Sequence, residues 1–246
     1  MLAIDYLNQI RALFERIEQT QMDKINAAAD MIADSMATGG ALHIFDTGHM
    51  LNQELVNRVG GFMALAPLTF GINVNDPVPV KLQNRPREAD LDPALEQIRV
   101  ALRLSNIRRG DSLIIGTVSG RTPNVIEMAI AAREMGVKVI ALTSLQYSSQ
   151  VTSKHPSGKR LFEVADIALD NCGVLGDACM EVPGLHTKAL PTSGIGAATV
   201  AWCLMAQTME KLLERGVTPH IFMSANLDEG PAFNEKEKAE CDKEGV

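Results

Sequence analysis

The sequence predicts an α/β fold: a doubly wound, five-stranded parallel sheet with helices on both faces, preceded by a long N-terminal helix. Five short apolar segments alternate with segments of helical periodicity, and every connection is long enough for a crossover between parallel strands. Hydrophobic residues make up 46% of the chain but aromatic residues only 4%. Such an aliphatic core is typical of helices packed on a parallel sheet, which favours an α-β-α sandwich.

The N-terminal segment carries apolar residues at helical spacing from Ile4 to about Met36, and Gly39-Gly40 end the pattern. One face of a single domain rarely needs so long a helix, so we expect part of the stripe to pack against another subunit. The alternative is two shorter helices, broken near Thr20, that both pack within the chain. The expected domains are an N-terminal helical segment at 1–38, a main domain at 39–216 and a C-terminal extension at 217–246.

The remaining elements follow in order along the chain. Strands are expected at 41–45, 64–70, 113–115, 137–142 and 167–169. Helices are expected at 51–63, 93–107, 123–135, 161–164 and 195–215. The connections between them include a long excursion at 71–92, a polar and mobile loop at 146–160 and a second long loop at 171–194. The charged tail at 235–246 is expected to be a frayed, solvated end.

The stretch from Asp111 to Pro123 is the clearest functional signal. An apolar strand ends in a tight loop rich in hydroxyl groups, and Pro123 suits the first position of a helix that Thr122 can cap. Free main-chain N–H groups, the helix dipole and an arginine side chain favour a bound anion. The simpler alternative is an ordinary capped turn between strand and helix. The candidate phosphate-binding residues are Thr117, Ser119, Gly120, Arg121 and Thr122.

No Gly-x-x-x-x-Gly-Lys-Ser/Thr or Gly-x-Gly-x-x-Gly string occurs, so the expected ligand is a phosphate ester smaller than a nucleotide. Ligands of doubly wound sheets bind at the carboxyl ends of the strands, where the strand order reverses. Further hydroxyl-bearing or glycine-containing turns are expected at the same edge. They contain Thr47, Gly48 and His49, then Thr143 and Ser144, and finally Thr192 and Ser193.

Composition and charge limit the partners. The formal net charge of −7 disfavours nucleic acid and anionic membranes as partners. The N-terminus has no signal-peptide pattern and no apolar run is long enough to span a bilayer, so a cytoplasmic protein is expected. Four scattered cysteines predict reduced thiols rather than a disulfide framework.

These residues resemble the sugar isomerase (SIS) domain, a phosphosugar-binding fold. Gly116–Thr122 is similar to the Ser-x-Ser-Gly-x-Thr loop of that family, and Ala131–Ser144 resembles the segment that follows it. The likeness extends more weakly over 30–214. Two further stretches, 153–159 and 170–178, resemble uncharacterised, phosphoheptose-isomerase-like bacterial proteins.

The resemblance implies that Thr117, Ser119 and Thr122 hold a sugar phosphate, with either Thr143-Ser144 or Thr192-Ser193 contributing. The chain departs from the family pattern at two positions of the first loop. Asp46 stands where glycine is frequent, and Met50 stands where a serine usually reaches the ligand.

Isomerisation of an aldose or ketose phosphate through an enediolate needs a base and an acid, and requires no metal, nicotinamide or other cofactor. The resemblance favours Glu54 as the base. The alternative is a solvated Glu54 that forms an ordinary helix-surface ion pair with Arg58, four residues further on. His186 is the preferred acid and His49 the second choice, because both lie in loops expected at the carboxyl edge. Asp177 and Glu181 are further candidates, either for hydrogen bonds to sugar hydroxyl groups or for acid–base work.

Three functions remain open at this stage: a sugar-phosphate isomerase, a 6-phosphosugar lyase or etherase, and a non-catalytic sugar-phosphate sensor that acts through a partner. The expected assembly is a homodimer or larger homo-oligomer. Cys172, Cys179 and His186 recur at a regular spacing, but this spacing is not a known metal-ligand geometry, and no metal site is predicted.

Overall fold

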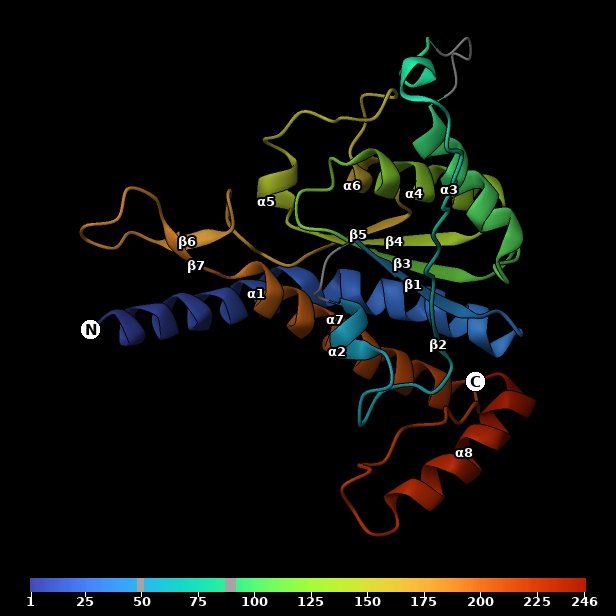
Figure 1. The fold of residues 1–246 in the computed structure, drawn as a ribbon. Coiled ribbons are helices and arrows are strands. Elements are labelled where there is room, and N and C mark those ends of the chain that lie inside the picture. Colours follow the sequence, from blue (N-terminus) through green and yellow to red (C-terminus); the bar gives the residue numbers. More distant parts are fainter. Residues whose placement is uncertain (48–50, 87–91) are drawn as a thin grey trace.

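A parallel sheet with strand order β2-β1-β3-β4-β5 forms the centre of the structure (Figure 1). The computed structural model describes residues 1–47, 51–86 and 92–246. The strands are β1 (Leu42–Asp46), β2 (Leu65–Pro67), β3 (Ser112–Gly116), β4 (Lys138–Thr143) and β5 (Ile167–Asp170). The strand order reverses between β1 and β3, which lie side by side. The predicted fold class and its five parallel strands are therefore confirmed.

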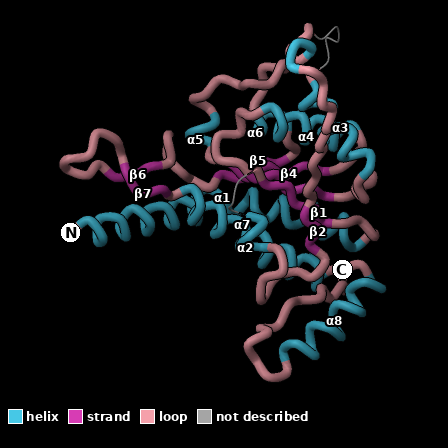
Figure 2. The backbone as a smooth tube through the Cα atoms, viewed as in Figure 1, coloured by secondary structure: helices cyan, strands magenta, loops and turns pink. Residues whose placement is uncertain are grey.

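Helices cover both faces of this sheet (Figure 2). One face carries α1 (Leu2–Ala37) and α7 (Ser193–Glu214), and the other carries α3 (Pro93–Leu104), α4 (Pro123–Glu134) and α6 (Leu161–Val164). Alternate residues of a strand point to opposite faces. Accordingly, Ile114 packs in the core beside α1 and α7, whereas Leu113 and Ile115 pack beside α3 and α4.

Helix α1 is continuous, so the alternative of two helices broken near Thr20 is wrong. The Thr20 hydroxyl donates to the Arg16 carbonyl at 2.6 Å, and the residue therefore bonds within the helix instead of interrupting it. With 36 residues the helix is about 54 Å long. Its N-terminal end projects past the sheet (Figure 1), and there Leu7 is 47% exposed.

A hairpin accompanies this projecting end of α1. Strands β6 (Ala178–Met180) and β7 (Ala189–Pro191) pair antiparallel within the segment predicted to be a long loop. The Tyr6 hydroxyl of α1 donates to the Pro191 carbonyl at 2.8 Å. We call the projecting turns of α1 (residues 2–9) and the hairpin (178–191) together the arm.

Helix α2 (Leu51–Leu55) is much shorter than predicted. The chain leaves the helix, and Asn57 has a left-handed backbone conformation with φ 55°. Residues 60–63 pair with the C-terminal extension instead. Gly60 N–H donates to the Phe222 carbonyl at 2.8 Å, and Met63 N–H donates to the His220 carbonyl at 2.9 Å. The expected helix at 51–63 is thus wrong beyond Leu55 because a partner distant in sequence competes for this backbone.

The C-terminal extension ends in helix α8 (Gly230–Glu244), so the prediction of a frayed end is wrong. Most of α8 is solvated, but Cys241 is buried. The ring of His220 lies 2.7 Å from Glu237 and 3.2 Å from Glu244, which ties the helix to the strand-like segment before it.

Two other connections differ in part from expectation. The excursion at 71–92 contains only the short 3-10 helix η1 (Val80–Leu82) among its described residues. The segment at 146–160, predicted to be a mobile loop, begins inside helix α5 (Leu145–Ser148). Its middle is anchored, because His155 is only 8% exposed.

Candidate functional site

The carboxyl ends of β1, β3 and β4 bring three of the predicted loops together. Asp46 and Gly116 are register partners at the ends of β1 and β3, and Thr47 N–H donates to the Gly116 carbonyl at 3.4 Å. Gly116 permits this close approach, because a Cβ there would lie 3.1 Å from an Asp46 carboxylate oxygen and 2.6 Å from Leu51. Gly48 and His49 lie outside the described residues.

The loop after β3 is shaped by the end of β4. The Val118 carbonyl accepts from the Ser144 N–H at 3.0 Å and from the Thr143 hydroxyl at 2.8 Å. Thr117 N–H donates to the Leu142 carbonyl at 3.1 Å. The Ser144 hydroxyl in turn donates to the carbonyl of Gly173, beyond β5. Thr143 and Ser144 were predicted to contact a ligand. In the structure their hydroxyl and main-chain groups form hydrogen bonds that hold this loop in position.

Gly120 is the tightest point of the loop. Its φ of +58° is a left-handed conformation that favours glycine. A Cβ there would lie 2.9 Å from the Ser148 hydroxyl, 3.3 Å from the Thr143 hydroxyl and 3.3 Å from Leu161. At Gly120 the main chain of the loop thus lies closer to α5 and α6 than a residue with a Cβ atom would allow.

Carboxylates from the protein cap three of the helices that begin at this edge. A main-chain N–H of each helix start donates to a carboxylate oxygen: Leu51 to Asp46 at 2.7 Å, Leu145 to Asp170 at 2.9 Å and Ser193 to Asp177 at 2.8 Å. A helix N-terminus that already holds a carboxylate has little room for a second anion. The start of α4 is different, because Thr122 makes no side-chain cap hydrogen bond.

Among the described helices that begin at this edge, α4 is consequently the one whose N-terminus no carboxylate side chain caps. Pro123 lacks an N–H, and the following amides of Asn124 and Val125 belong to the first turn, whose N–H groups have no partner inside the helix. Arg121 directly precedes Thr122, the N-cap residue of the helix. Thr122 was predicted to cap α4 with its hydroxyl, and that prediction is wrong: its hydroxyl oxygen is buried without a hydrogen-bond partner.

Buried polar atoms without a partner concentrate at the same edge. Among the described residues, six of these atoms lie on segments that follow the carboxyl ends of strands or start α7: Asn52 Oδ1, Arg121 Nε, Thr122 Oγ1, Ser148 Oγ, Asn171 Nδ2 and Thr192 Oγ1. The remaining one, Ser112 Oγ, lies at the start of β3. Native proteins leave few buried polar groups unsatisfied, so a cluster of them marks a candidate position for ordered water or a polar ligand. We call this group the unsatisfied edge cluster.

Three of its members were missed by the sequence analysis: Asn52, Ser148 and Asn171. Each lies shortly after a predicted strand, but burial is decided by neighbours distant in sequence. Asn171 is fully buried, and its Oδ1 accepts from Gly173 N–H at 2.9 Å while its Nδ2 has no partner.

The start of α7 lies beside the loop after β5. A Cβ on Gly173 would lie 3.5 Å from Ser193, and the Ser193 hydroxyl donates to Asp177 at 2.8 Å. Asp177 also accepts from the Thr192 N–H at 3.1 Å. Asp177 is therefore engaged as a helix cap, and Thr192 and Ser193 lie near the edge as expected.

Glu54 projects from α2 with both carboxylate oxygens in contact with the protein. Its Oε1 accepts from the Trp202 indole N–H at 3.2 Å, and its Oε2 lies 3.8 Å from Arg58. The side chain is 39% exposed, so the ion pair with Arg58 is weak. The expected pair with Arg58 is therefore present, Trp202 is an unforeseen partner, and the role of Glu54 as a base stays a prediction.

His186 does not join this group within one chain. It is exposed in the connection between β6 and β7, and the hairpin extends away from the sheet (Figure 1). Glu181, also on this hairpin, is a solvated carboxylate 3.9 Å from Lys188. Burial raises the pKa of the Cys172 and Cys179 thiols, which opposes the thiolate form that binds metals.

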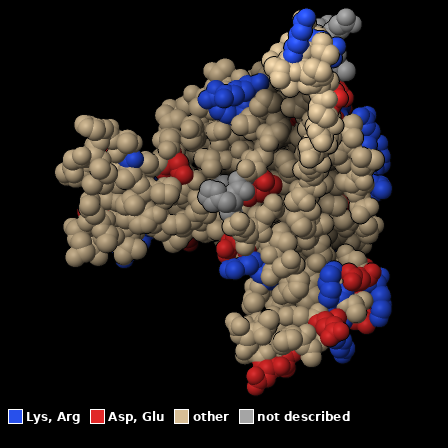
Figure 3. All heavy atoms as spheres, in the orientation of Figure 1, with Lys and Arg blue, Asp and Glu red and all other residues tan. Residues whose placement is uncertain are grey.

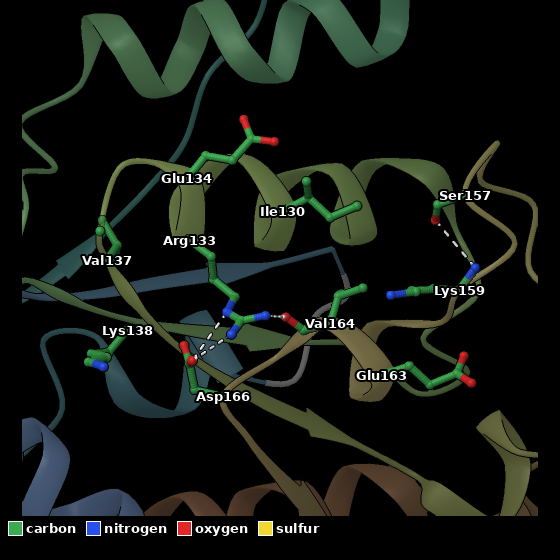
Figure 4. Close-up of a pocket in the computed structure, with 11 residues that line it drawn as sticks. Ile130, Arg133, Glu134, Val137, Lys138, Ser157, Lys159, Glu163, Val164 and Asp166 are labelled. Carbon is green, nitrogen blue, oxygen red and sulfur yellow. Dashed lines mark hydrogen bonds and ion pairs between the residues drawn. The ribbon is translucent and has the colours of Figure 1, made fainter.

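Positive charge lies beside the edge, over the segment that joins α5 to α6 (Figure 3). That segment carries Lys154, Lys159 and Arg160. A cavity of about 600 Å³ lies on its other side (Figure 4). There Arg133 is 3.0 Å from Asp166, and Lys138 marks the amino end of β4, so this cavity is not at the carboxyl edge.

None of the described helices combines the length and apolar character needed to cross a membrane.

Comparison with known proteins identifies the family. The SIS domain model matches residues 5–144. A UPF0309 protein of Shouchella clausii is 34% identical over 236 residues, covering 94% of this chain and 92% of that protein. A UPF0309 protein of Streptomyces avermitilis is 34% identical over 242 residues, covering 96% and 93%. In fold, the chain resembles a phosphoheptose isomerase from Francisella tularensis, with a TM-score of 0.52 at 15% identity over 85% of this chain and 96% of that one. The chain therefore belongs to the SIS domain family.

Proposed function

We propose that this protein binds a sugar phosphate at the carboxyl edge of its sheet and interconverts the aldose and ketose forms of that sugar. The observation that carries the proposal is the start of α4, which is the helix end left without a carboxylate cap beside the unsatisfied edge cluster. A phosphate there accepts from the amides of the first turn and from Arg121. Thr117, Ser119, Gly120 and Thr122 complete the phosphate-binding loop.

The sugar extends from α4 along the strand ends. Neighbouring strands lie about 4.8 Å apart, so the edge from β1 to β5 spans about 14 Å, enough for a phosphate and an open-chain sugar. Asn171 and Thr192 lie at the far end with polar atoms to share with sugar hydroxyl groups. Thr47, Thr143, Ser144 and Ser193 border the path.

Glu54 is the proposed base. Trp202 fixes Oε1 by its indole N–H, and the 3.8 Å separation from Arg58 leaves Oε2 able to accept a proton. In the proposed reaction the carboxylate removes a proton from C1 or C2 of the sugar, which gives an enediolate. It then returns the proton to the other of these two carbons.

The proposed acid is a histidine. His49 follows β1 in the chain, and His186 is carried on the arm. Because the arm points away from its own edge cluster, His186 can act only on the site of a second copy, which agrees with the proposed homo-oligomer. A sensor that binds the sugar phosphate without chemistry is the second candidate function. The position of His186 favours this second candidate, because a single chain does not bring Glu54 and His186 together.

Two experiments test the proposal. Ser119→Ala combined with Thr122→Ala should abolish the thermal stabilisation that a panel of pentose, hexose and heptose phosphates gives the wild type. An unchanged stabilisation would exclude the phosphate site.

The same panel is then followed by deuterium exchange at C1 and C2 in heavy water. The isomerase predicts exchange with at least one sugar, lost in Glu54→Gln. Binding without exchange would instead support the sensor, and exchange unaffected by Glu54→Gln would exclude Glu54 as the base.

A further inference from the structure

The segment between α5 and α6 is bonded directly to the backbone of the phosphate-binding loop. Lys154 N–H donates to the Arg121 carbonyl at 2.9 Å, and Leu161 N–H donates to the Gly120 carbonyl at 2.8 Å. These two hydrogen bonds hold the main chain of Gly120 and Arg121, the two residues before Thr122, the N-cap residue of α4. Any shift of the segment therefore moves the main chain on which the phosphate would rest.

His155 anchors this segment from within. Its side chain is 6% exposed, and its Nε2 lies 2.9 Å from Glu127 Oε2 on α4. Ser157 N–H donates to the His155 Nδ1 at 3.1 Å, so Nδ1 is an acceptor and the ring proton is on Nε2, which donates to Glu127. The Ser157 hydroxyl, 2.8 Å from Nδ1, closes the turn. His155 thus joins a tight turn of the segment to α4 in one defined tautomer.

Glu127 makes the other half of the anchor rigid. It lies one turn into α4, is 4% exposed, and forms an ion pair with Arg99 of α3. A buried carboxylate needs such partners, because burial of an unpaired charge is costly. The chain of contacts runs from α3 through Glu127 and His155 to Lys154 and then to the Arg121 carbonyl.

We propose that His155 is a positioning residue for phosphate binding: by holding Glu127 of α4 against the 153–157 turn, it fixes the Gly120-Arg121 backbone in the shape that receives the phosphate. This inference rests on the proposed function. The proposed reaction does not use His155, and its burial keeps it from touching the sugar. Its effect passes through the Lys154–Arg121 hydrogen bond.

The same chain offers a matched control. His43 and Asp111 form a second buried histidine–carboxylate pair, with Nε2 and Oδ2 3.0 Å apart and both side chains 7% exposed. This pair lies at the amino ends of β1 and β3, whereas the phosphate loop follows the carboxyl end of β3. His43→Ala and His155→Ala therefore each remove one buried histidine–carboxylate contact, and only the second should disturb the α4 start.

The experiment has two measurements on each of four proteins: wild type, His155→Ala, His155→Gln and His43→Ala. Amide hydrogen exchange in the ligand-free protein reports on the Lys154 and Leu161 N–H groups. Titration with inorganic phosphate, followed by the amide signals of Asn124 and Val125, reports on binding. His155→Gln keeps an N–H donor for Glu127 and serves as the conservative variant.

For His155→Ala we expect faster exchange at Lys154 and Leu161. We also expect phosphate affinity to weaken at least about tenfold, which is the loss of metal affinity when a residue that orients a metal ligand is removed. His155→Gln should recover most of both, and His43→Ala should change neither. Equal phosphate affinity in wild type and His155→Ala would overturn the inference, as would an equal loss in His43→Ala. If the wild type binds no phosphate, the proposed function fails. Unchanged exchange at Lys154 in His155→Ala would separately show that His155 does not hold the loop.

Discussion

Replacing Thr122 by Asp should stabilise the protein and block phosphate binding in the same variant. The start of α4 has no side-chain cap, whereas Asp46, Asp170 and Asp177 cap the neighbouring helices. A carboxylate that accepts from the first turn of a helix adds about 0.5–2 kcal/mol of stability. We take about 1 kcal/mol, because Thr122 is half-buried and desolvation of the new charge offsets part of the gain.

The same carboxylate competes with the phosphate for the amides of the first turn and repels it. Two unit charges 4 Å apart interact with about 4 kcal/mol at an effective dielectric constant of about 20. Since about 1.4 kcal/mol corresponds to a tenfold change in affinity, binding should weaken by well over about a hundredfold. Stability and binding are thus predicted to change in opposite directions, which a general loss of folding cannot produce.

Thermal unfolding with and without the sugar phosphate selected from the panel measures both effects. For a chain of this size about 1 kcal/mol corresponds to about 2–4 °C, so the ligand-free variant should melt about that much higher than wild type. Ligand at about a hundred times its dissociation constant should raise the wild-type melting temperature by about 5–10 °C and leave the variant unchanged.

A cap on a different helix provides the control. Asp92 caps α3 by accepting from the Ala94 N–H at 3.0 Å, at a helix start outside the edge cluster. Asp92→Ala should lower stability by about 1 kcal/mol and keep the full ligand-induced shift. If Thr122→Asp keeps that shift, the phosphate does not bind at α4. If it lowers stability instead, the start of α4 is not an available anion site.

Three further predictions follow from single features of the structure. Gly120→Ala should lose at least about 1–2 kcal/mol in denaturant unfolding and also lose phosphate binding, whereas Gly184→Ala, with φ +89° but open space around its Cβ position, should keep binding. Burial alone would lower the pKa of His220, but hydrogen bonds to two glutamates of α8 raise it overall. Its stabilising contribution is therefore complete below the ordinary histidine pKa of about 6.5 and is lost as the pH rises through the raised value, so His220→Asn should flatten the pH dependence of thermal unfolding above that point. Leu7→Ser with Phe14→Ser, which remove exposed apolar side chains from α1, should shift sedimentation toward the monomer, and an unchanged sedimentation coefficient would contradict the proposed role of this stripe.

The sheet and the position of the candidate phosphate loop at its carboxyl edge could be predicted because their signals are local. An apolar run such as Leu113–Ile115 indicates a buried strand wherever it occurs, and hydroxyl residues directly after it lie at the carboxyl edge by topology alone. The strand ends therefore meet as expected, with Asp46 opposite Gly116.

The elements that were missed depend on partners distant in sequence. Helix α2 stops early because Gly60 and Met63 bond to the C-terminal extension, and α8 is ordered where His220 meets its glutamates. The members of the edge cluster share this property. Asn171 and Ser148 are ordinary polar residues in the sequence, and only the packed structure buries them without partners.

The distribution of caps also explains how a chain of net charge −7 can accept an anion. At this edge the carboxylates of Asp46, Asp170 and Asp177 each accept from helix or loop amides, so their charge is met locally by main-chain dipoles. Charges beyond about 8–10 Å are largely screened at physiological salt, and the rest of the acidic surface has little effect at contact distance. At the proposed site a phosphate would meet the one helix end of the described edge that has no such cap, with Arg121 nearby. In the proposed site, the acidic residues therefore favour the start of α4 for the phosphate, because they already occupy the starts of the neighbouring helices.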